Sequence, residues 1–393
     1  METIYFDNAA TSWPKPDAVL AAMENYFRFV GASPGRSGHR LSIEAGRGVF
    51  ETRNALVSLF GAKDPLRIVF TKNATEALNI FIFGLIQPGD HVIVSSMEHN
   101  SVMRPLRAAA VALEADLTVI PCNPFGRLDP EDVRRAIRKN TRIVFLTHAS
   151  NVTGTIMPVA EVGRICREHD VLFCVDAAQS AGAVPIDVEA MNIDLLAFTG
   201  HKSLLGPQGT GGLYARKGID ARMRPLMMGG TGSRSEHEHQ PEFMPDKYES
   251  GTLNTIGLIG LGAGVREICS IGIEKIRQRE LELTAAFMEG ASGISGVTVY
   301  GDPDPNGRVP VVSFNIDGMR ASDVGLQLDD ANGIMCRPGL HCAPSAHRTL
   351  GTAPHGTVRF SFGYFNTREQ IDTALNAIEA LSFSSRRKSS CPA

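Results

Sequence analysis

The sequence predicts an α/β protein with a mostly parallel β-sheet, followed by a smaller unit of mixed α+β structure. Short runs rich in β-branched residues alternate with helical patterns between residues 67 and 215. Such alternation is typical of βαβ units, whose helices cover both faces of a parallel sheet. From residue 257 onward the pattern changes to longer helical stretches with isolated strand-like runs, which favours a second, α+β domain.

Within the first unit the strands and helices can be assigned in order along the chain. The strand-like runs span residues 67–71, 91–95, 117–121, 142–147, 172–176 and 194–202. The helical patterns between them span residues 74–85, 101–114, 130–139 and 159–169. A final run at 211–215 is predicted to be a late, antiparallel strand.

The smaller unit follows a segment rich in Gly, His and charge at 229–250, which predicts an extended loop or hairpin with little core. One long helix is predicted at 257–289. Alternating strand-like and helical runs follow at 310–315, 322–331, 357–362 and 368–381. The polar residues 383–393, which include Cys391, are predicted to form a disordered tail.

The composition excludes several classes of function. The 393 residues are enough for two or three domains, and a hydrophobic content of 43% is ordinary for a globular protein. The net charge of −3 provides no basic field for nucleic acid or an anionic membrane. No apolar stretch is long enough to span a bilayer, and the N-terminus lacks the features of a secretory signal. A cytoplasmic location is therefore predicted.

The seven cysteines do not suggest a metal site. Their odd number and the lack of C-x-x-C spacing argue against a disulfide framework and a zinc site. Cys166 and Cys174 lie in apolar patterns and are expected to be inert core thiols. Cys342 differs, because the glycine and proline around it predict a loop or a loop–helix junction. Its thiol, beside His341, could be partly ionised and reactive, although a buried structural cysteine is the alternative.

Two residues at predicted strand ends carry the strongest chemical signal. Asp176 ends one apolar run and Lys202 ends the next. The carboxyl ends of parallel strands meet in one crevice, where α/β folds bind ligands. A lysine there can form a Schiff base with an aldehyde cofactor, and a carboxylate can keep a pyridine nitrogen protonated. Together they suggest pyridoxal phosphate, whereas either residue alone could be an Asp at a turn or a solvated Lys.

A phosphate site is predicted where the first strand turns into a helix, near Thr75. Backbone N–H groups at the helix start, with the Thr75 hydroxyl, would bind a phosphate. An ordinary helix start, capped by Asn73 or Thr75, is the alternative. Thr199 and His201 flank Lys202 and could also donate hydrogen bonds to the phosphate.

Three more side chains are candidates for contact with a ligand. Gln179 follows Asp176 closely and could reach the hydroxyl group of the cofactor ring. His99 follows a strand and could stack on the ring or move protons, although a lone histidine in a loop is more often a surface residue. Arg359 lies in an otherwise apolar run, so burial would point to a carboxylate ligand or to an Asp or Glu partner.

Eight motifs give the chain a resemblance to a known family. They run in family order over residues 4–381 and comprise Tyr5–Thr11, Asn73–Glu76, Glu98–Asn100, His148–Gly154, Asp176–Gln179, Thr199–Lys202, Glu249–Asn254 and Arg337–Cys342. With these motifs the chain resembles the fold type I pyridoxal-phosphate enzymes of aminotransferase class V. Within them it resembles the cysteine desulfurases of the SUF-type, selenocysteine lyase-like group.

The resemblance implies an arrangement of domains. A large cofactor-binding domain of residues 15–255 would contain a seven-stranded, mostly parallel sheet. Residues 1–14 and 256–382 would form the small domain, which carries Cys342 and Arg359.

The resemblance also implies roles for residues around the cofactor ring. Lys202 matches the lysine that forms the Schiff base, and Asp176 matches the partner of the pyridinium nitrogen. Gln179 matches the partner of the phenolic oxygen. His99 matches a catalytic histidine stacked on the ring.

Further matches concern the phosphate and the substrate. The phosphate-binding positions are matched by Ala74, Thr75, Thr199 and His201. Thr252 matches a threonine that reaches the phosphate from the neighbouring subunit, which implies a homodimer. Arg359 matches the arginine that binds the substrate carboxylate, and Asn151 matches an asparagine near that carboxylate and the ring oxygen.

The implied activity is that of a cysteine desulfurase. Sulfur would leave L-cysteine as a persulfide on Cys342, L-alanine would be released, and the sulfur would pass to an acceptor protein. Iron–sulfur cluster assembly, thiolated cofactors and selenium metabolism are all open as pathways. Leu340 departs from the commonest motif, which has a histidine there, so the acceptor and the acid–base surroundings of Cys342 stay open.

Two alternative functions remain at the level of sequence. The first keeps the cofactor, as a selenocysteine lyase or another class V aminotransferase or lyase. The second is a nucleotide- or anion-binding module that uses the glycine-rich stretches at 206–212 and 229–232. Neither stretch fits G-x-G-x-x-G or a P-loop, so a close approach of backbone near the cofactor is the simpler explanation.

Overall fold

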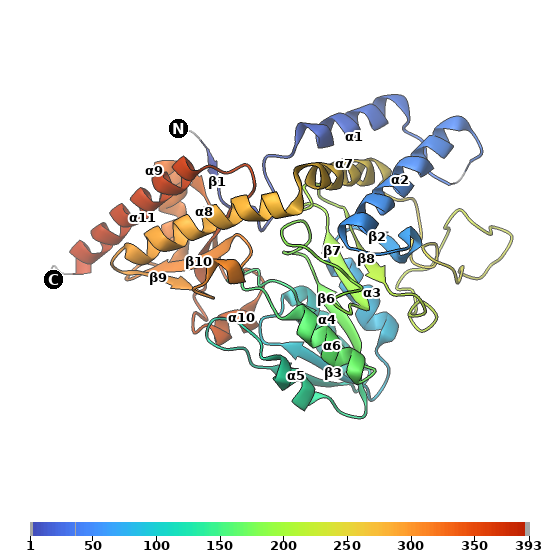
Figure 1. The fold of residues 1–393 in the computed structure, drawn as a ribbon, viewed down its shortest axis with the longest axis horizontal. Coiled ribbons are helices and arrows are strands. Elements are labelled where there is room, and N and C mark those ends of the chain that lie inside the picture. The colour runs from blue at the N-terminus through green and yellow to red at the C-terminus, as the bar shows by residue number, and fades with distance from the viewer. Residues whose placement is uncertain (1–2, 36, 390–393) are drawn as a thin grey trace.

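The computed structural model describes residues 3–35 and 37–389, which form two units along one long axis (Figure 1). The larger unit is built on a seven-stranded sheet and the smaller on a four-stranded sheet. The predicted α/β fold with a mostly parallel large sheet is confirmed.

The large sheet has the strand order β2-β8-β7-β6-β5-β3-β4. In chain order its strands are β2 (Ile68–Thr71), β3 (His91–Ser95), β4 (Asp116–Ile120), β5 (Thr141–Thr147), β6 (Leu172–Asp176), β7 (Leu195–Thr199) and β8 (Gly211–Ala215). Neighbouring strands are parallel except where β8 pairs antiparallel with β2 and β7, as predicted. Asp176 ends β6 and Lys202 closely follows β7, so both lie at the carboxyl edge of the sheet.

Helices cover both faces of this sheet. One face packs against α3 (Ala74–Leu85) and α4 (Asn100–Ala112). The other packs against α2 (Arg40–Leu59), α5 (Pro130–Ala136), α6 (Val159–Glu168) and α7 (Thr255–Ile271). The helix α1 (Asp17–Phe29) packs on α7. Neither α1 nor α2 has a counterpart among the predicted elements.

The single helix predicted over 257–289 is wrong. The chain forms two helices, α7 and α8 (Ile273–Gly293), which meet at an angle of 82°. Gly272 between them has φ 91°, a conformation that residues with a Cβ rarely adopt. The helix α7 packs against α1 and α2, while α8 packs against elements of the smaller unit, so the packing partners change at Gly272.

The smaller unit has a four-stranded sheet in the order β12-β13-β10-β9, with all pairs antiparallel. Its strands are β9 (Val297–Tyr300), β10 (Val311–Ile316), β12 (Arg337–Gly339) and β13 (Thr357–Ser361). Its other elements are α9 (Ala321–Asn332), α10 (Pro344–Thr349), α11 (Arg368–Ser389) and the parallel pair β1 (Ile4–Tyr5) and β11 (Ile334–Met335). Through β1 and the buried Phe6, the N-terminal segment belongs to the core of this unit.

The disordered tail predicted from residue 383 is wrong as far as Ser389, because α11 continues to that residue. Two serine hydroxyls tie this part of the helix to the smaller unit: Ser382 donates to the carbonyl of Ser295 at 2.6 Å, and Ser385 donates to that of Asp317 at 2.8 Å. Cys391 lies outside the described residues.

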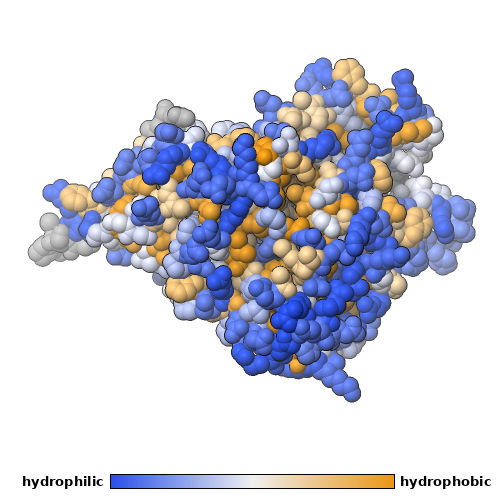
Figure 2. All heavy atoms as spheres, in the orientation of Figure 1, coloured by the Kyte–Doolittle hydropathy of each residue, from blue (hydrophilic) through white to orange (hydrophobic). Residues whose placement is uncertain are grey.

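The surface of the molecule is mixed in character. Figure 2 shows hydrophilic residues over the lower part of one face, where α5 and α6 lie, and apolar residues nearer its centre.

Over the described residues, a search for helices long and apolar enough to cross a membrane finds no single one. Only α7 and α8 together meet that criterion, and the chain bends sharply between them. Within the same part of the chain, no group of three or more His, Cys, Asp or Glu side chains could hold a metal ion.

Candidate active site

A cavity of about 180 Å³ opens at the carboxyl edge of the large sheet. Its lining comprises Asn73, Ala74, Thr75, His99, Ser101, Thr147, Ala149, Asn151, Asp176, Ala178, Gln179, Thr199, His201 and Lys202. Every residue predicted to bind the cofactor therefore lies in one place, with the exception of Thr252. Asn73, Ser101, Thr147, Ala149 and Ala178 join them without having been predicted as site residues.

Lys202 and Asp176 both line this cavity, and each affects the charge of the other. Burial lowers the pKa of Lys202 to about 8, and the negative charge of Asp176 opposes that shift. Burial raises the pKa of Asp176, while a hydrogen bond from the Ala178 N–H at 2.9 Å and the charge of Lys202 oppose this. The site thus holds an amine with a lowered pKa and, near it, a carboxylate that has no ion pair with any of the described residues.

One end of the cavity is suited to a phosphate. Ala74 and Thr75 begin α3, where backbone N–H groups have no partner within the helix. The Thr199 hydroxyl and His201 Nδ1 are buried here and make no hydrogen bond within the described part of the chain. The side chain of Asn73 caps the helix by accepting a hydrogen bond from the Glu76 N–H at 3.0 Å. The alternative prediction, a helix start capped by Asn73, is therefore also correct. Several unsatisfied donors therefore converge where an anion would fit.

Gly211, at the start of β8, explains one of the glycine-rich stretches. A Cβ on this residue would lie 2.7 Å from the Cα of Asn73 and 2.8 Å from the carbonyl oxygen of Phe198. Any side chain would therefore push the backbone of the phosphate-binding turn away from the sheet. The glycine serves close packing behind the cavity, as the sequence suggested.

His99 is held as a neutral ring. Its Nδ1 accepts a hydrogen bond from the Ser101 N–H at 3.0 Å, so the ring proton sits on Nε2. Burial lowers the pKa of His99 to about 4, with the charge of Lys202 contributing in the same direction. A neutral imidazole that donates from Nε2 can lie on an aromatic ring without adding a positive charge.

Two buried groups behind the cavity lie in motifs recognised in the sequence but were not predicted as site residues. Glu98 accepts hydrogen bonds from the Ser95 hydroxyl at 2.6 Å and the Thr147 N–H at 3.0 Å, and burial raises its pKa to about 8. His148 is buried beside the end of β6, and burial lowers its pKa to about 4. Both follow strand ends, which is the signal that could have found them.

Arg359 lies in β13 with its side chain almost fully buried. Its Nη2 donates to Asp7 Oδ1 at 2.8 Å, and its Nη1 donates to the carbonyl of Asn151 at 3.1 Å. Its Nε is buried and makes no hydrogen bond within the described residues. Arg337 is the register partner of Arg359 on β12, so two guanidinium groups stand side by side near the cavity.

Cys342 lies on the turn between β12 and α10, as predicted, with its side chain exposed. His341 and Cys342 both have left-handed backbone conformations, with φ 49° and 59°. The turn is held in place on both sides: the Asn100 N–H donates to the carbonyl of Cys342 at 2.8 Å, and Asn151 Nδ2 donates to that of His341 at 2.6 Å. Strained backbone of this kind persists only where the surroundings impose it.

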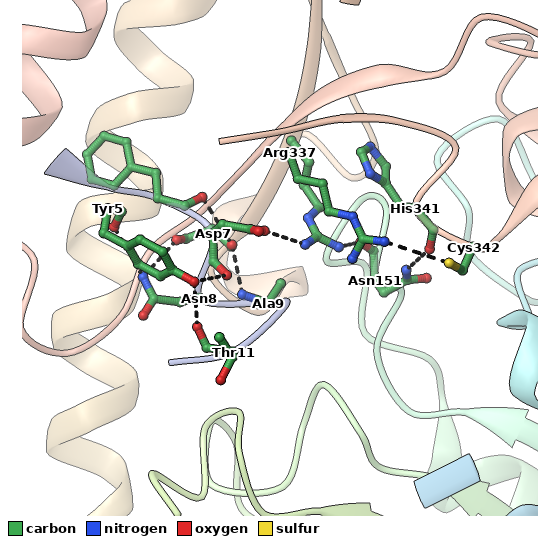
Figure 3. A network of polar contacts seen from close by, with 12 residues as sticks. Tyr5, Asp7, Asn8, Ala9, Thr11, Asn151, Arg337, His341 and Cys342 are labelled. Carbon is green, nitrogen blue, oxygen red and sulfur yellow. Dashed lines mark hydrogen bonds and ion pairs between the residues drawn. The ribbon is translucent and has the colours of Figure 1, made fainter. Parts of the chain in front are cut away.

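The charged neighbour of the Cys342 sulfur is Arg337 and not His341. Arg337 Nη2 lies 3.7 Å from Sγ (Figure 3). The ring of His341 is buried and bonded through Nε2 to the Thr357 hydroxyl at 3.1 Å, and burial lowers its pKa to about 2. The expectation that His341 would help to ionise the thiol is therefore wrong, and Arg337 is the residue that the sequence reading missed.

Thr252 lies outside the cavity of its own chain. It is exposed and lines a separate pocket of about 180 Å³ with Lys72, Glu76 and Met227 among its neighbours. Thr252 therefore does not line the cavity that contains Lys202 in its own chain.

Comparison with known proteins gives a consistent family. Residues 4–374 match the family model Aminotransferase class-V. A probable cysteine desulfurase from Methanothermobacter thermautotrophicus is 39% identical over 385 residues, covering 96% of this chain and 94% of the relative. A cysteine desulfurase from Haloferax volcanii is 34% identical over 384 residues, covering 96% of this chain and 89% of the relative.

Solved structures show the same similarity. The apo structure of a cysteine desulfurase from Thermococcus onnurineus NA1 superposes with a TM-score of 0.92 at 37% identity, covering 97% of this chain and 95% of that one. A cysteine desulfurase from Escherichia coli that carries an S-sulfonic acid gives a TM-score of 0.85 at 28% identity, covering 96% of this chain and 94% of that one.

Proposed function

The chain belongs to the aminotransferase class-V family, whose members use pyridoxal phosphate, and we propose that it acts as a cysteine desulfurase on L-cysteine. The main support for this proposal is a hydrogen bond that connects the cavity to the turn of His341 and Cys342. Asn151 lines the cavity and also bonds to the backbone of His341, next to the exposed Cys342. A nucleophilic thiol is thus presented at the entrance of a site built around a reactive lysine.

The residues of the cavity fit pyridoxal phosphate. The first turn of α3 with Thr199 and His201 offers unsatisfied donors to the phosphate, and Asp176 offers a carboxylate to the pyridine nitrogen. Pyridoxal phosphate, when bound, supplies an aldehyde that joins amino groups and a ring that accepts negative charge from the substrate. Lys202 is the amine placed to hold that aldehyde.

Substrate binding and proton transfer fall to three side chains. Arg359 would bind the carboxylate of L-cysteine, since a guanidinium suits bidentate carboxylate binding. Lys202 would accept the proton from Cα, because a pKa of about 8 leaves about a tenth of the amine neutral at pH 7. His99 stays neutral at this pH and would cover the ring face.

Cys342 would carry out the sulfur transfer. The Cys342 thiolate attacks the sulfur of L-cysteine, and the carbon–sulfur bond of the substrate breaks. The electron pair of that bond stays with the carbon, which takes up a proton to give L-alanine. The sulfur remains on Cys342 as a persulfide. Arg337, at 3.7 Å, would stabilise negative charge on the attacking sulfur.

The proposal is tested by incubating the cofactor-loaded protein separately with L-cysteine, L-selenocysteine and L-serine. We expect L-alanine from L-cysteine, with one sulfur released to a thiol reductant for each alanine, and no alanine from L-serine. Alanine from L-selenocysteine alone would support the alternative selenocysteine lyase. No alanine from either substrate would contradict the desulfurase reading.

Uptake of the cofactor should depend on pH through Lys202. Only the neutral amine reacts with an aldehyde, and the neutral fraction rises as pH increases through the lowered pKa of about 8. We expect the rate of pyridoxal phosphate uptake by the apoprotein to fall about tenfold for each pH unit below 8 and to level off above it. Stopped-flow absorbance in the visible range measures this rate. A rate that keeps rising to pH 10 would show that the pKa of the Lys202 amine is not lowered.

We propose that the protein works as a homodimer in which Thr252 contacts the phosphate bound by the partner subunit. The exposed apolar side chains Phe27 and Phe29 on α1 and Ile43 on α2 would be covered by a second copy. Met228, also exposed, lies next to the Thr252 loop, because the Gly251 N–H donates to the carbonyl of Gly230 at 2.8 Å.

Replacing Thr252 with alanine should weaken cofactor binding without altering the fold. We expect the dissociation constant of pyridoxal phosphate to rise about tenfold, as for loss of a hydrogen bond to a charged group. Equilibrium dialysis measures the affinity and sedimentation measures the dimer. The exposed Thr298 on β9 supplies the control, Thr298→Ala. Unchanged affinity in a dimeric Thr252→Ala protein would remove Thr252 from the site.

The persulfide sulfur would pass to an acceptor protein at the exposed cysteine turn. Leu340, 37% exposed beside Cys342, offers that acceptor an apolar contact where the commonest motif has a histidine. Iron–sulfur cluster assembly and a cytoplasmic location remain predictions from the sequence.

A further inference from the structure

The N-terminal segment of residues 7–15 touches three parts of the active site that lie far apart in the chain. Asp7 bonds to Arg359, and the carbonyl of Ala9 accepts from Gln179 Nε2 at 3.1 Å. Thr11 Oγ1 and Lys15 Nζ donate to the carbonyl of His201 at 3.0 and 2.8 Å. The segment thus joins the substrate-binding arginine, the ring-binding glutamine and the residue before Lys202.

Among these contacts, the ion pair between Asp7 and Arg359 joins two opposite charges, one of them almost fully buried. Nη2 and Oδ1 are 2.8 Å apart, with the side chain of Arg359 1% exposed and that of Asp7 22% exposed. Arg337 and Lys202 both lie close enough to Arg359 to act on the same groups electrostatically. A buried arginine among other cations needs a counter-charge, because an unpaired buried charge is strongly destabilising.

Asp7 is itself fixed in place. The Tyr5 hydroxyl donates to the carbonyls of Asp7 and Thr11 at 3.3 and 3.0 Å (Figure 3). The backbone after Asp7 is anchored too, since the Ala9 N–H donates to the Ser361 hydroxyl at 2.8 Å. The carboxylate is therefore not a mobile surface group that happens to meet an arginine.

One nitrogen of the Arg359 guanidinium has no hydrogen-bond partner among the described residues. Nη2 is engaged by Asp7 and Nη1 by the carbonyl of Asn151, whereas the buried Nε makes no hydrogen bond within residues 3–35 and 37–389. Burial lowers the pKa of Arg359, and the charge of Asp7 opposes that shift. Asp7 therefore holds the arginine charged and oriented, and Nε is a donor with no partner among the described residues.

We infer that Asp7 is a positioning residue that fixes Arg359 to receive the carboxylate of the substrate. This inference rests on the proposed function, because it takes Arg359 as the carboxylate-binding residue. Asp7 does not touch the reacting atoms; it acts through the guanidinium. Its removal should therefore impair recognition of the carboxylate while recognition of the amino group is retained.

The test compares two ligands that differ only in the carboxylate. The cofactor-loaded protein is titrated with L-alanine and with ethylamine, and binding is followed by visible absorbance. In Asp7→Asn we expect the dissociation constant of L-alanine to rise about tenfold, the scale of a lost hydrogen bond to a charged group. That of ethylamine should stay within about twofold. Asp17→Asn, an exposed position in the first turn of α1, is the matched control.

A double-mutant cycle shows whether Asp7 acts through Arg359. In an Arg359→Ala background, Asp7→Asn should cause no further loss of L-alanine affinity, because the group that it positions is gone. Equal weakening of both ligands in Asp7→Asn would indicate general structural damage and overturn the inference. Tighter binding of L-alanine would overturn it as well, since Asp7 would then compete with the substrate.

The wild-type protein separates failure of this inference from failure of the proposed function. If the wild type binds L-alanine no more tightly than ethylamine, Arg359 does not bind the carboxylate and the proposed substrate binding is wrong. If the wild type prefers L-alanine and Asp7→Asn keeps the full preference, only the inference fails. Should Asp7→Asn not fold, Tyr5→Phe removes the hydroxyl that fixes Asp7 and should reduce the same preference by a smaller factor.

Discussion

Replacing Lys202 with alanine is expected to abolish alanine release from L-cysteine and the yellow colour of the cofactor-loaded protein. The lysine supplies the only amine that lines the cavity among the described residues. It is also the group placed to accept the Cα proton. Loss of a positioned general base alone lowers a rate by about 100- to 10,000-fold. Absorbance of the purified protein and an assay for L-alanine measure the two effects.

The matched control for this variant is Lys63→Ala. Lys63 is exposed and makes a surface ion pair with Glu189 at 3.2 Å. The control should keep both colour and activity. Alanine release at more than about a tenth of the wild-type rate in Lys202→Ala would mean that another group removes the proton.

Replacing Cys342 with serine is expected to stop sulfur transfer while leaving the cofactor in place. The cysteine lies outside the cavity lining, and the turn is held by backbone hydrogen bonds that a serine would keep. A serine hydroxyl does not accept sulfur from L-cysteine, so alanine release should fall more than about 100-fold. The protein should stay yellow and should still bind L-alanine.

Cys269→Ser provides the control for the cysteine variant. Cys269 is another exposed cysteine, located on α7 in the larger unit. Its replacement should leave alanine release unchanged. If Cys342→Ser retains full activity with L-cysteine, the reaction does not pass through this thiol. Activity retained with L-selenocysteine alone would indicate that selenium leaves without the help of Cys342.

The sheet and its helices were predictable because their signals are local. Runs such as 91–95 and 172–176 are apolar and rich in β-branched residues, and the structure places strands at both. The bend at Gly272 was not predictable from periodicity, because the helical pattern continues on both sides of it. The helix over 383–389 was missed because its polar sequence is held by distant contacts, such as those from Ser382 and Ser385.

Some active-site residues could also be predicted from local patterns, whereas others depend on contacts between distant parts of the chain. Residues at strand ends, such as Asp176 and Lys202, could be found from position alone, since parallel strands end at one edge. The ion pair between Asp7 and Arg359 joins residues 352 positions apart, and no local pattern connects them. Arg337 lay in a recognised motif, yet its place beside Cys342 depends on a turn with left-handed backbone that the sequence does not specify.

In the proposed reaction, Cys342 receives the sulfur of L-cysteine. The most direct measurement is mass spectrometry of the cofactor-loaded protein after a single turnover with L-cysteine and no reductant. We expect the peptide containing Cys342 to gain the mass of one sulfur atom, in step with one L-alanine released per subunit. The gain should be reversed by a thiol reductant and be absent from the peptide containing Cys269. Release of L-alanine with no added sulfur on Cys342 would show that the sulfur does not pass through this thiol.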